Sequence, residues 1–149
     1  MSARPSRQEL EAGNDDFCKH LLAFVKKHHP KGKSALTEVG AKSLTCFLYL
    51  YSVVCQDNPL SLHAKASSEV PVGAGLGSSA ALAVSLSAAL WRCFHGQPAS
   101  IEQVDRLAHL SELIVHGPKA SGIDTYVSSH GGVVSLKRES GGQCQRLVC

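Results

Sequence analysis

A glycine-rich run is the part of this sequence best suited to chemistry. Residues 71–81 read Pro-Val-Gly-Ala-Gly-Leu-Gly-Ser-Ser-Ala-Ala, and a long apolar stretch follows. The alternate glycines allow tight turns and close backbone approach, and Ser78 and Ser79 would open a helix whose free amides attract an anion. A simple strand-to-helix turn would also need small residues, but the full run favours phosphate binding. No lysine follows the last glycine, so the run is not a P-loop.

Two downstream carboxylates are further candidates. Glu112 falls near the C-terminal end of a predicted helix, where a negative charge opposes the helix dipole and adds little to packing. Asp124 falls in the first turn of a short helix predicted to begin within residues 121–124, where an acid has an ordinary stabilising role. The residues alone therefore leave Asp124 open between a helix-stabilising and a chemical role.

The elements that position these residues are predicted to be mostly helical. Apolar periodicity and breakers predict helices from Asn14 to before Pro30, from Ser34 to about Cys55, and from about Ser78 to Phe94. A capping box of Ser100 and Gln103 predicts the helix that carries Glu112, with an apolar face of Ile101, Val104, Leu107, Ala108 and Ile114. Alternating residues from Leu60 to Ser67 predict a strand leading into the glycine-rich run, and residues 131–136 predict a returning strand.

Composition narrows the class of protein. The chain has 149 residues, 44% hydrophobic and 18% charged, which fits one domain over residues 14–149 after a polar lead-in at 1–13. The net charge of +3 comes with dispersed Lys and Arg, so a nucleic-acid partner is not expected and a small-molecule ligand is. No uninterrupted apolar run reaches membrane-spanning length. Six cysteines form no Cys-x-x-Cys pair, and Cys46, Cys55 and Cys93 fall in apolar helical patterns, which favours packed thiols and a reduced, cytoplasmic (cytosolic) setting.

The glycine-rich run resembles the second motif of the GHMP small-molecule kinases, Pro-x-x-x-Gly-Leu-Gly-Ser-Ser-Ala, and the preceding Ser68-Glu69 is similar to the mevalonate kinase branch of that family. The similarity extends from about Leu36 to Leu136 and includes Phe47-Leu48-Tyr49-Leu50-Tyr51 and Glu112-x-x-x-His116-Gly117. The resemblance implies an α+β fold, the GHMP kinase N-terminal domain of ribosomal protein S5 domain 2-like architecture. It also implies ATP-dependent phosphorylation of mevalonate to 5-phosphomevalonate in isoprenoid and sterol biosynthesis.

Site residues are carried over from this family position by position. The resemblance implies Asp124 as the catalytic base, Mg²⁺ ligands at Ser79 and Glu112, and an ATP site formed by Ser68, Gly73, Ala74, Gly75, Leu76, Gly77, Ser78 and Ser79. These types suit the chemistry, because hydroxyl and carboxylate oxygens are hard ligands for Mg²⁺ and phosphoryl transfer to an alcohol uses a carboxylate near the hydroxyl proton. ATP and Mg²⁺ are the expected cofactors, mevalonate is the expected partner, and a homodimer stays open.

The sequence departs from the family pattern in several places. Pro118-Lys119-Ala120 is one residue longer than the common spacing, and Thr125 stands where the family usually has Asn. The first strands, with a catalytic lysine and a Gly-Glu-His motif, and the C-terminal domain are expected to be missing, so impaired activity is expected of the isolated chain. Lys119 is interpreted as a solvated loop residue rather than a substitute for that lysine. Two alternatives stay open: a non-catalytic nucleotide-binding remnant or splice product, and a GHMP kinase for another alcohol such as galactose or homoserine.

Overall fold

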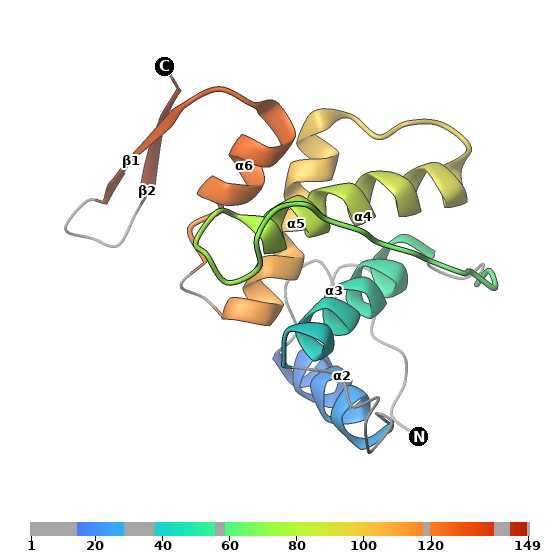
Figure 1. Cartoon of the computed structure of the whole chain (residues 1–149). Coiled ribbons are helices and arrows are strands. Elements are labelled where there is room, and N and C mark those ends of the chain that lie inside the picture. The colour runs from blue at the N-terminus through green and yellow to red at the C-terminus, as the bar shows by residue number, and fades with distance from the viewer. Residues whose placement is uncertain (1–14, 29–37, 56–58, 118–119, 139–143, 149) are drawn as a thin grey trace.

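The structure is a computed structural model that describes residues 15–28, 38–55, 59–117, 120–138 and 144–148. Within these ranges the chain is mostly helical, with one antiparallel pair of strands (Figure 1). In chain order the elements are α2 Asp15–His28, α3 Glu38–Cys55, α4 Ser78–His95, α5 Ile101–His116, α6 Ile123–His130, β1 Val134–Arg138 and β2 Cys144–Val148. The pairing register runs from Val134 opposite Val148 to Arg138 opposite Cys144.

The hydrophobic core lies between α3, α4 and α5. Its buried members are Cys46, Tyr49, Leu50, Val53, Val54, Ala83, Leu90, Leu107 and Ala108. The buried side chains of α4 are mostly short, including Ala80, Ala83 and Ser87, and small residues allow neighbouring helices to approach closely. Full burial of a leucine such as Leu50 is typically worth about 2–5 kcal/mol relative to alanine. Packing among α3, α4 and α5 therefore forms a rigid frame, and this frame holds the start of α4 next to the end of α5.

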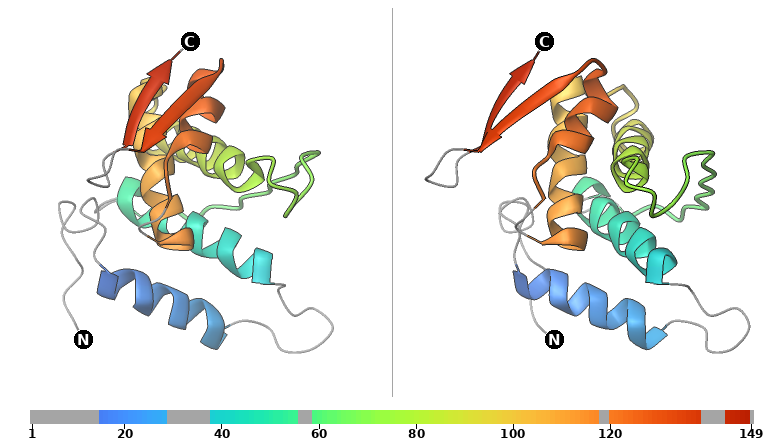
Figure 2. Two further views of the ribbon diagram at one scale, coloured as in Figure 1. Left: turned by 90° about the vertical axis from the view of Figure 1, so that its left-hand side faces the viewer. Right: turned by 60° about the vertical axis from the view of Figure 1, so that its left-hand side comes forward.

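The outer elements are attached to this frame at opposite ends. Helix α2 packs against α3, and α6 packs against α4 and α5. Figure 2 shows α2 at the end of the molecule farthest from the β1–β2 hairpin. No helix within the described residues is long and apolar enough to cross a membrane.

Several predicted helix boundaries are confirmed. Gly96 ends α4 in the left-handed conformation with φ of 71°, and its amide donates to the carbonyl oxygen of Arg92. The capping box at the start of α5 is present: the Gln103 amide donates to the Ser100 hydroxyl at 3.2 Å, and the Ser100 amide donates to the Gln103 side chain at 2.9 Å. The short helix predicted near Asp124 is α6, with Gly122 as its N-cap residue.

The predicted strand over residues 60–67 is wrong. This segment has no regular secondary structure and every residue in it is exposed, although the Tyr51 hydroxyl fixes its beginning by donating to the Leu60 carbonyl at 2.8 Å. In Figure 1 it runs as an extended green trace toward the start of α4. Alternating apolar and polar residues indicate that a segment could have one buried and one exposed face, but they do not supply a neighbouring strand. A strand needs such a neighbour because its backbone amides and carbonyls must form hydrogen bonds. No such neighbour pairs with it among the described residues.

Smaller expectations also need correction. Ile101, assigned to the apolar face of α5, is 52% exposed because it occupies the first turn, beyond the reach of the core. Cys93 is exposed rather than packed, whereas Cys46 and Cys55 are buried as predicted. The returning strand begins at Val134 rather than Gly131, and its partner β2 was not predicted. The lead-in at 1–13, the Asn14 cap, the breakers Pro30 and Gly32, and the helix start at Ser34 lie outside the described residues.

Candidate functional site

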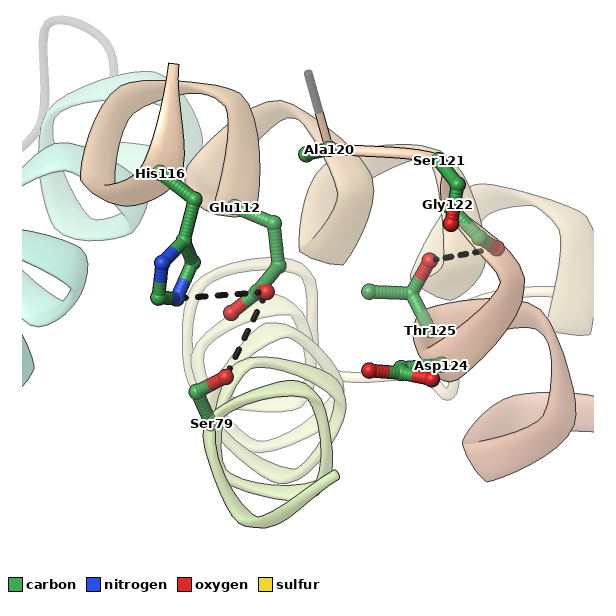
Figure 3. Close-up of a pocket in the computed structure, with 8 residues that line it drawn as sticks. All are labelled: Ser79, Glu112, His116, Ala120, Ser121, Gly122, Asp124 and Thr125. Atoms are coloured by element: carbon green, nitrogen blue, oxygen red, sulfur yellow. Dashed lines mark hydrogen bonds and ion pairs between the residues drawn. The ribbon is translucent and has the colours of Figure 1, made fainter. Parts of the chain in front are cut away.

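Three helix ends meet around a pocket of about 220 Å³ (Figure 3). The first turn of α4, the last turns of α5 and the connection into α6 supply its walls. The lining residues are Ser79, Glu112, His116, Ala120, Ser121, Gly122, Asp124 and Thr125. Three residues singled out from the sequence, separated by up to 45 positions, therefore face one space.

The glycine-rich run enters the site at the N-terminus of α4. Gly77 is the N-cap residue and adopts a left-handed conformation, with φ of 70° and ψ of 22°, and no side chain caps this end of the helix. The first hydrogen bond of α4 joins the Ala81 amide to the Gly77 carbonyl at 3.0 Å. The amides of residues 78–80 precede that bond, so they have no partner within the helix, and the helix dipole adds partial positive charge there. This end of α4 is suited to an anionic group.

Ser79 and Glu112 lie side by side although 33 positions separate them in sequence. The Ser79 hydroxyl donates to Glu112 Oε2 at 3.3 Å, and the Glu112 side chain is only 12% exposed. Two neighbouring oxygen ligands of an octahedral Mg²⁺ ion are about 2.9 Å apart, given metal–oxygen distances of 2.0–2.1 Å. The two groups are therefore of the type that Mg²⁺ prefers, and the separation of their oxygens is only about 0.4 Å longer than that of adjacent Mg²⁺ ligands.

Mg²⁺ needs fewer protein ligands than a metal held entirely by side chains. Within the described residues, no group of three His, Cys, Asp or Glu side chains could hold a metal ion. Mg²⁺ is commonly bound by one or two protein oxygens together with substrate phosphates. A Ser79–Glu112 pair beside an anion-attracting helix end matches that pattern.

A buried thiol lies behind Glu112. Burial raises the pKa of Cys46 to about 11, and the charge of Glu112 also raises it. The Cys46 thiol donates to Ser111 Oγ at 3.4 Å. The Ser111 hydroxyl in turn donates to the Ala108 carbonyl at 2.8 Å. Cys46 therefore stays protonated near neutral pH and adds no charge next to the carboxylate.

Asp124 faces the glycine-rich run from α6. A Cβ atom built on Gly77 would lie 3.8 Å from Asp124 Cβ and 3.9 Å from its Cγ, so the carboxylate stands directly across from the start of α4. The Asp124 side chain is exposed, and the neighbouring Thr125 is buried with its hydroxyl donating to the Gly122 carbonyl at 3.2 Å. Thr125 thus anchors the first turn of α6 while Asp124 stays accessible to a ligand.

The remaining members of the predicted ATP site do not line the pocket. Ser68 accepts a hydrogen bond from the Val70 amide at 3.1 Å and so shapes the approach to the run. Residues 73–76, Gly73, Ala74, Gly75 and Leu76, are exposed, and Ser78 is half-buried at the start of α4. The pocket itself comprises Ser79 and residues farther along the chain.

Several pocket residues were not predicted. His116 lies four residues after Glu112 on α5, and that spacing places both side chains on one face of the helix, a signal available in the sequence. The contribution of Ala120, Ser121 and Gly122 depends on how the segment before α6 folds back, which spacing does not indicate. Lys119 lies outside the described residues.

Comparison with known proteins identifies the family. The sequence matches the GHMP kinases N terminal domain over residues 42–132. This chain belongs to the GHMP kinase family. The match covers α3 from its second turn, the glycine-rich run, and all of α4, α5 and α6, so the three helix ends of the pocket are family elements. No solved structure gives a significant match.

Mevalonate kinases are among the curated relatives of this chain. The chain is 35% identical over 136 residues to mevalonate kinase erg12 of Aspergillus fumigatus, covering 80% of this chain and 25% of that protein. It is 33% identical over 137 residues to mevalonate kinase of Arabidopsis thaliana, which covers 83% of this chain and 34% of that protein. It is 36% identical over 112 residues to mevalonate kinase of Bos taurus, which covers 64% of this chain and 28% of that protein. The chain therefore spans about a quarter to a third of the length of these relatives.

Proposed function

We propose that this chain carries the nucleotide-phosphate and Mg²⁺ site of a mevalonate kinase, which transfers a phosphoryl group from ATP to mevalonate to form 5-phosphomevalonate. The observation that carries the proposal is the meeting of Ser79, Glu112 and Asp124 around one pocket at the N-terminus of α4. The kinase relatives supply the substrate class. On this proposal the chain is the central part of a domain with ribosomal protein S5 domain 2-like architecture.

The residues have distinct roles in this reaction. The uncapped amides at the start of α4 bind phosphate oxygens, and Gly77 keeps that surface open for close approach. Ser79 and Glu112 would hold Mg²⁺, which when bound offsets the negative charge of the phosphates. Asp124 orients the acceptor hydroxyl and takes its proton, a contribution worth about 10²–10⁴-fold in rate.

One observation favours a second candidate function, nucleotide binding without turnover. None of the described residues lining the pocket is a lysine or arginine. Charge on the transferring phosphoryl group normally needs a cationic side chain in addition to the metal. If the described lining is all that contacts the phosphates, the pocket would bind nucleotide without transferring phosphate efficiently.

Two measurements on this chain test the proposal and separate the candidates. Calorimetric titration with ATP, with and without Mg²⁺, should show binding that Mg²⁺ strengthens, and Glu112→Gln should remove the Mg²⁺ effect. A coupled ADP-release assay with mevalonate, galactose and homoserine then reports turnover. ADP release only with mevalonate supports the kinase, and ATP binding with no acceptor-dependent release supports the second candidate. Absence of ATP binding contradicts both.

A further inference from the structure

We propose that His116 is a positioning residue for the metal-binding carboxylate, and that its imidazole holds Glu112 in the orientation that faces Ser79. The inference rests on the proposed function, because it takes Glu112 to be a Mg²⁺ ligand. It adds a residue to which neither the sequence nor the comparisons gave a role.

Two side chains from different helices approach one carboxylate oxygen. His116 Nε2 lies 3.6 Å from Glu112 Oε2, and the Ser79 hydroxyl donates to the same oxygen at 3.3 Å. Figure 3 shows the carboxylate between the imidazole of His116 and the hydroxyl of Ser79. The oxygen nearest to Ser79 is therefore also the one that the imidazole approaches.

Glu112 needs such support because of where it lies. It is one turn from the C-terminal end of α5, where the helix dipole is negative and a carboxylate is disfavoured. Its long side chain could relieve that repulsion by rotating toward solvent, away from Ser79. An imidazole one turn farther along the same helix, with Nε2 3.6 Å from the carboxylate, opposes this rotation, in the way that outer partners of a metal site orient its ligands.

The exposure of His116 argues against a purely structural role. Its side chain is 43% exposed, so burial in the core does not hold it in place. A histidine at a helix C-terminus can also interact favourably with the last carbonyls, which would stabilise α5 without affecting the pocket. The two roles differ in their effect on Mg²⁺, since only positioning of Glu112 alters the response to the ion.

The experiment compares His116→Ala with His116→Gln by calorimetric titration of ATP across a series of Mg²⁺ concentrations at one fixed pH. Gln is the matched control because its side-chain amide places an N–H group at a reach similar to that of imidazole Nε2. We expect His116→Ala to raise the half-maximal Mg²⁺ concentration about 10-fold, the low end of the cost of losing an outer partner. ATP affinity without Mg²⁺ should be unchanged, and His116→Gln should recover most of the loss.

A reference variant, Glu112→Gln, separates failure of this inference from failure of the proposed function. If the unaltered chain shows no Mg²⁺-strengthened binding, or Glu112→Gln retains it, the assignment of Glu112 is wrong. If Glu112→Gln removes the Mg²⁺ effect while His116→Ala leaves it unchanged, the role of His116 is overturned. The role of His116 is also overturned if His116→Ala weakens ATP binding equally with and without Mg²⁺. It is overturned as well if His116→Gln requires as much Mg²⁺ for half-maximal effect as His116→Ala does.

Discussion

Gly77 is the residue at which the local geometry makes the sharpest prediction. Its φ of 70° lies in the left-handed region, where a residue with a Cβ atom costs about 1–2 kcal/mol. At the other end of α4, Gly96 has φ of 71°, and a Cβ atom added there would meet nothing within 4 Å, whereas one added to Gly77 would face Asp124 at 3.8 Å. The two glycines therefore share the backbone strain and differ in their surroundings.

The prediction compares Gly77→Val with Gly96→Val. Both should lose about 1–2 kcal/mol of unfolding free energy, which lowers the melting temperature by about 2–8 °C in a chain of this size. The γ carbons that Gly77→Val introduces extend about 1.5 Å beyond Cβ. They enter the space between the start of α4 and Asp124, where the phosphates are proposed to bind, so Gly77→Val should abolish ATP binding.

Calorimetric titration with ATP and Mg²⁺, together with thermal unfolding followed by circular dichroism, measures both effects. Gly96→Val should keep the affinity of the unaltered chain, since its strain lies at the far end of α4. Unchanged ATP affinity in Gly77→Val would remove the glycine-rich run from the site. Equal loss of affinity in both variants would show that general destabilisation, not access to the helix end, controls binding.

Three further predictions concern single side chains. Asp124→Asn should leave Mg·ATP affinity within about 2-fold and reduce any mevalonate-dependent ADP release by about 10²–10⁴-fold, and unchanged release would exclude Asp124 as the base. The pKa of Cys46 is raised from 9.0 to about 11 in the folded chain, because burial disfavours the thiolate. The unfolding free energy should therefore be highest below pH 9 and should fall by about 3 kcal/mol as the pH rises to 11, because only the unfolded chain loses this proton over that range. Denaturant titrations should show a shallower loss over that range in Cys46→Ala, and an identical slope would contradict the burial argument. Ser100→Ala should lower stability by about 1 kcal/mol through loss of the capping box, whereas Ser85→Ala, an exposed site within α4, should not.

The sequence indicated the helical part of the fold because the signals there are local. The Ser100–Gln103 capping box and Gly96 act within one turn, so neither depends on distant parts of the chain. The segment 60–67 shows the limit of that reasoning. Its alternation gives it the composition of a strand, but strand formation depends on a partner elsewhere in the chain, about which the alternation carries no information.

The candidate site also has a part that local sequence predicts and a part that depends on how the helices pack. The glycine-rich run predicted an anion-binding helix start because φ and free amides are local properties of Gly77 and the residues after it. The 3.3 Å approach of Ser79 to Glu112 is a product of packing between α4 and α5, and spacing alone could not indicate it. Family resemblance supplied that pairing. His116 could have been found from the sequence, since its four-residue spacing from Glu112 defines a shared helix face.

The central claim is that Ser79 and Glu112 hold a divalent ion beside nucleotide phosphates. The most direct test is a crystal structure of this chain with Mn²⁺ and a non-hydrolysable ATP analogue, in which anomalous scattering locates the ion. We predict one anomalous peak within coordination distance of Ser79 Oγ and a Glu112 carboxylate oxygen, with phosphate oxygens completing the shell. An ion bound to the phosphates but remote from both side chains, or an analogue bound away from the start of α4, would contradict this claim.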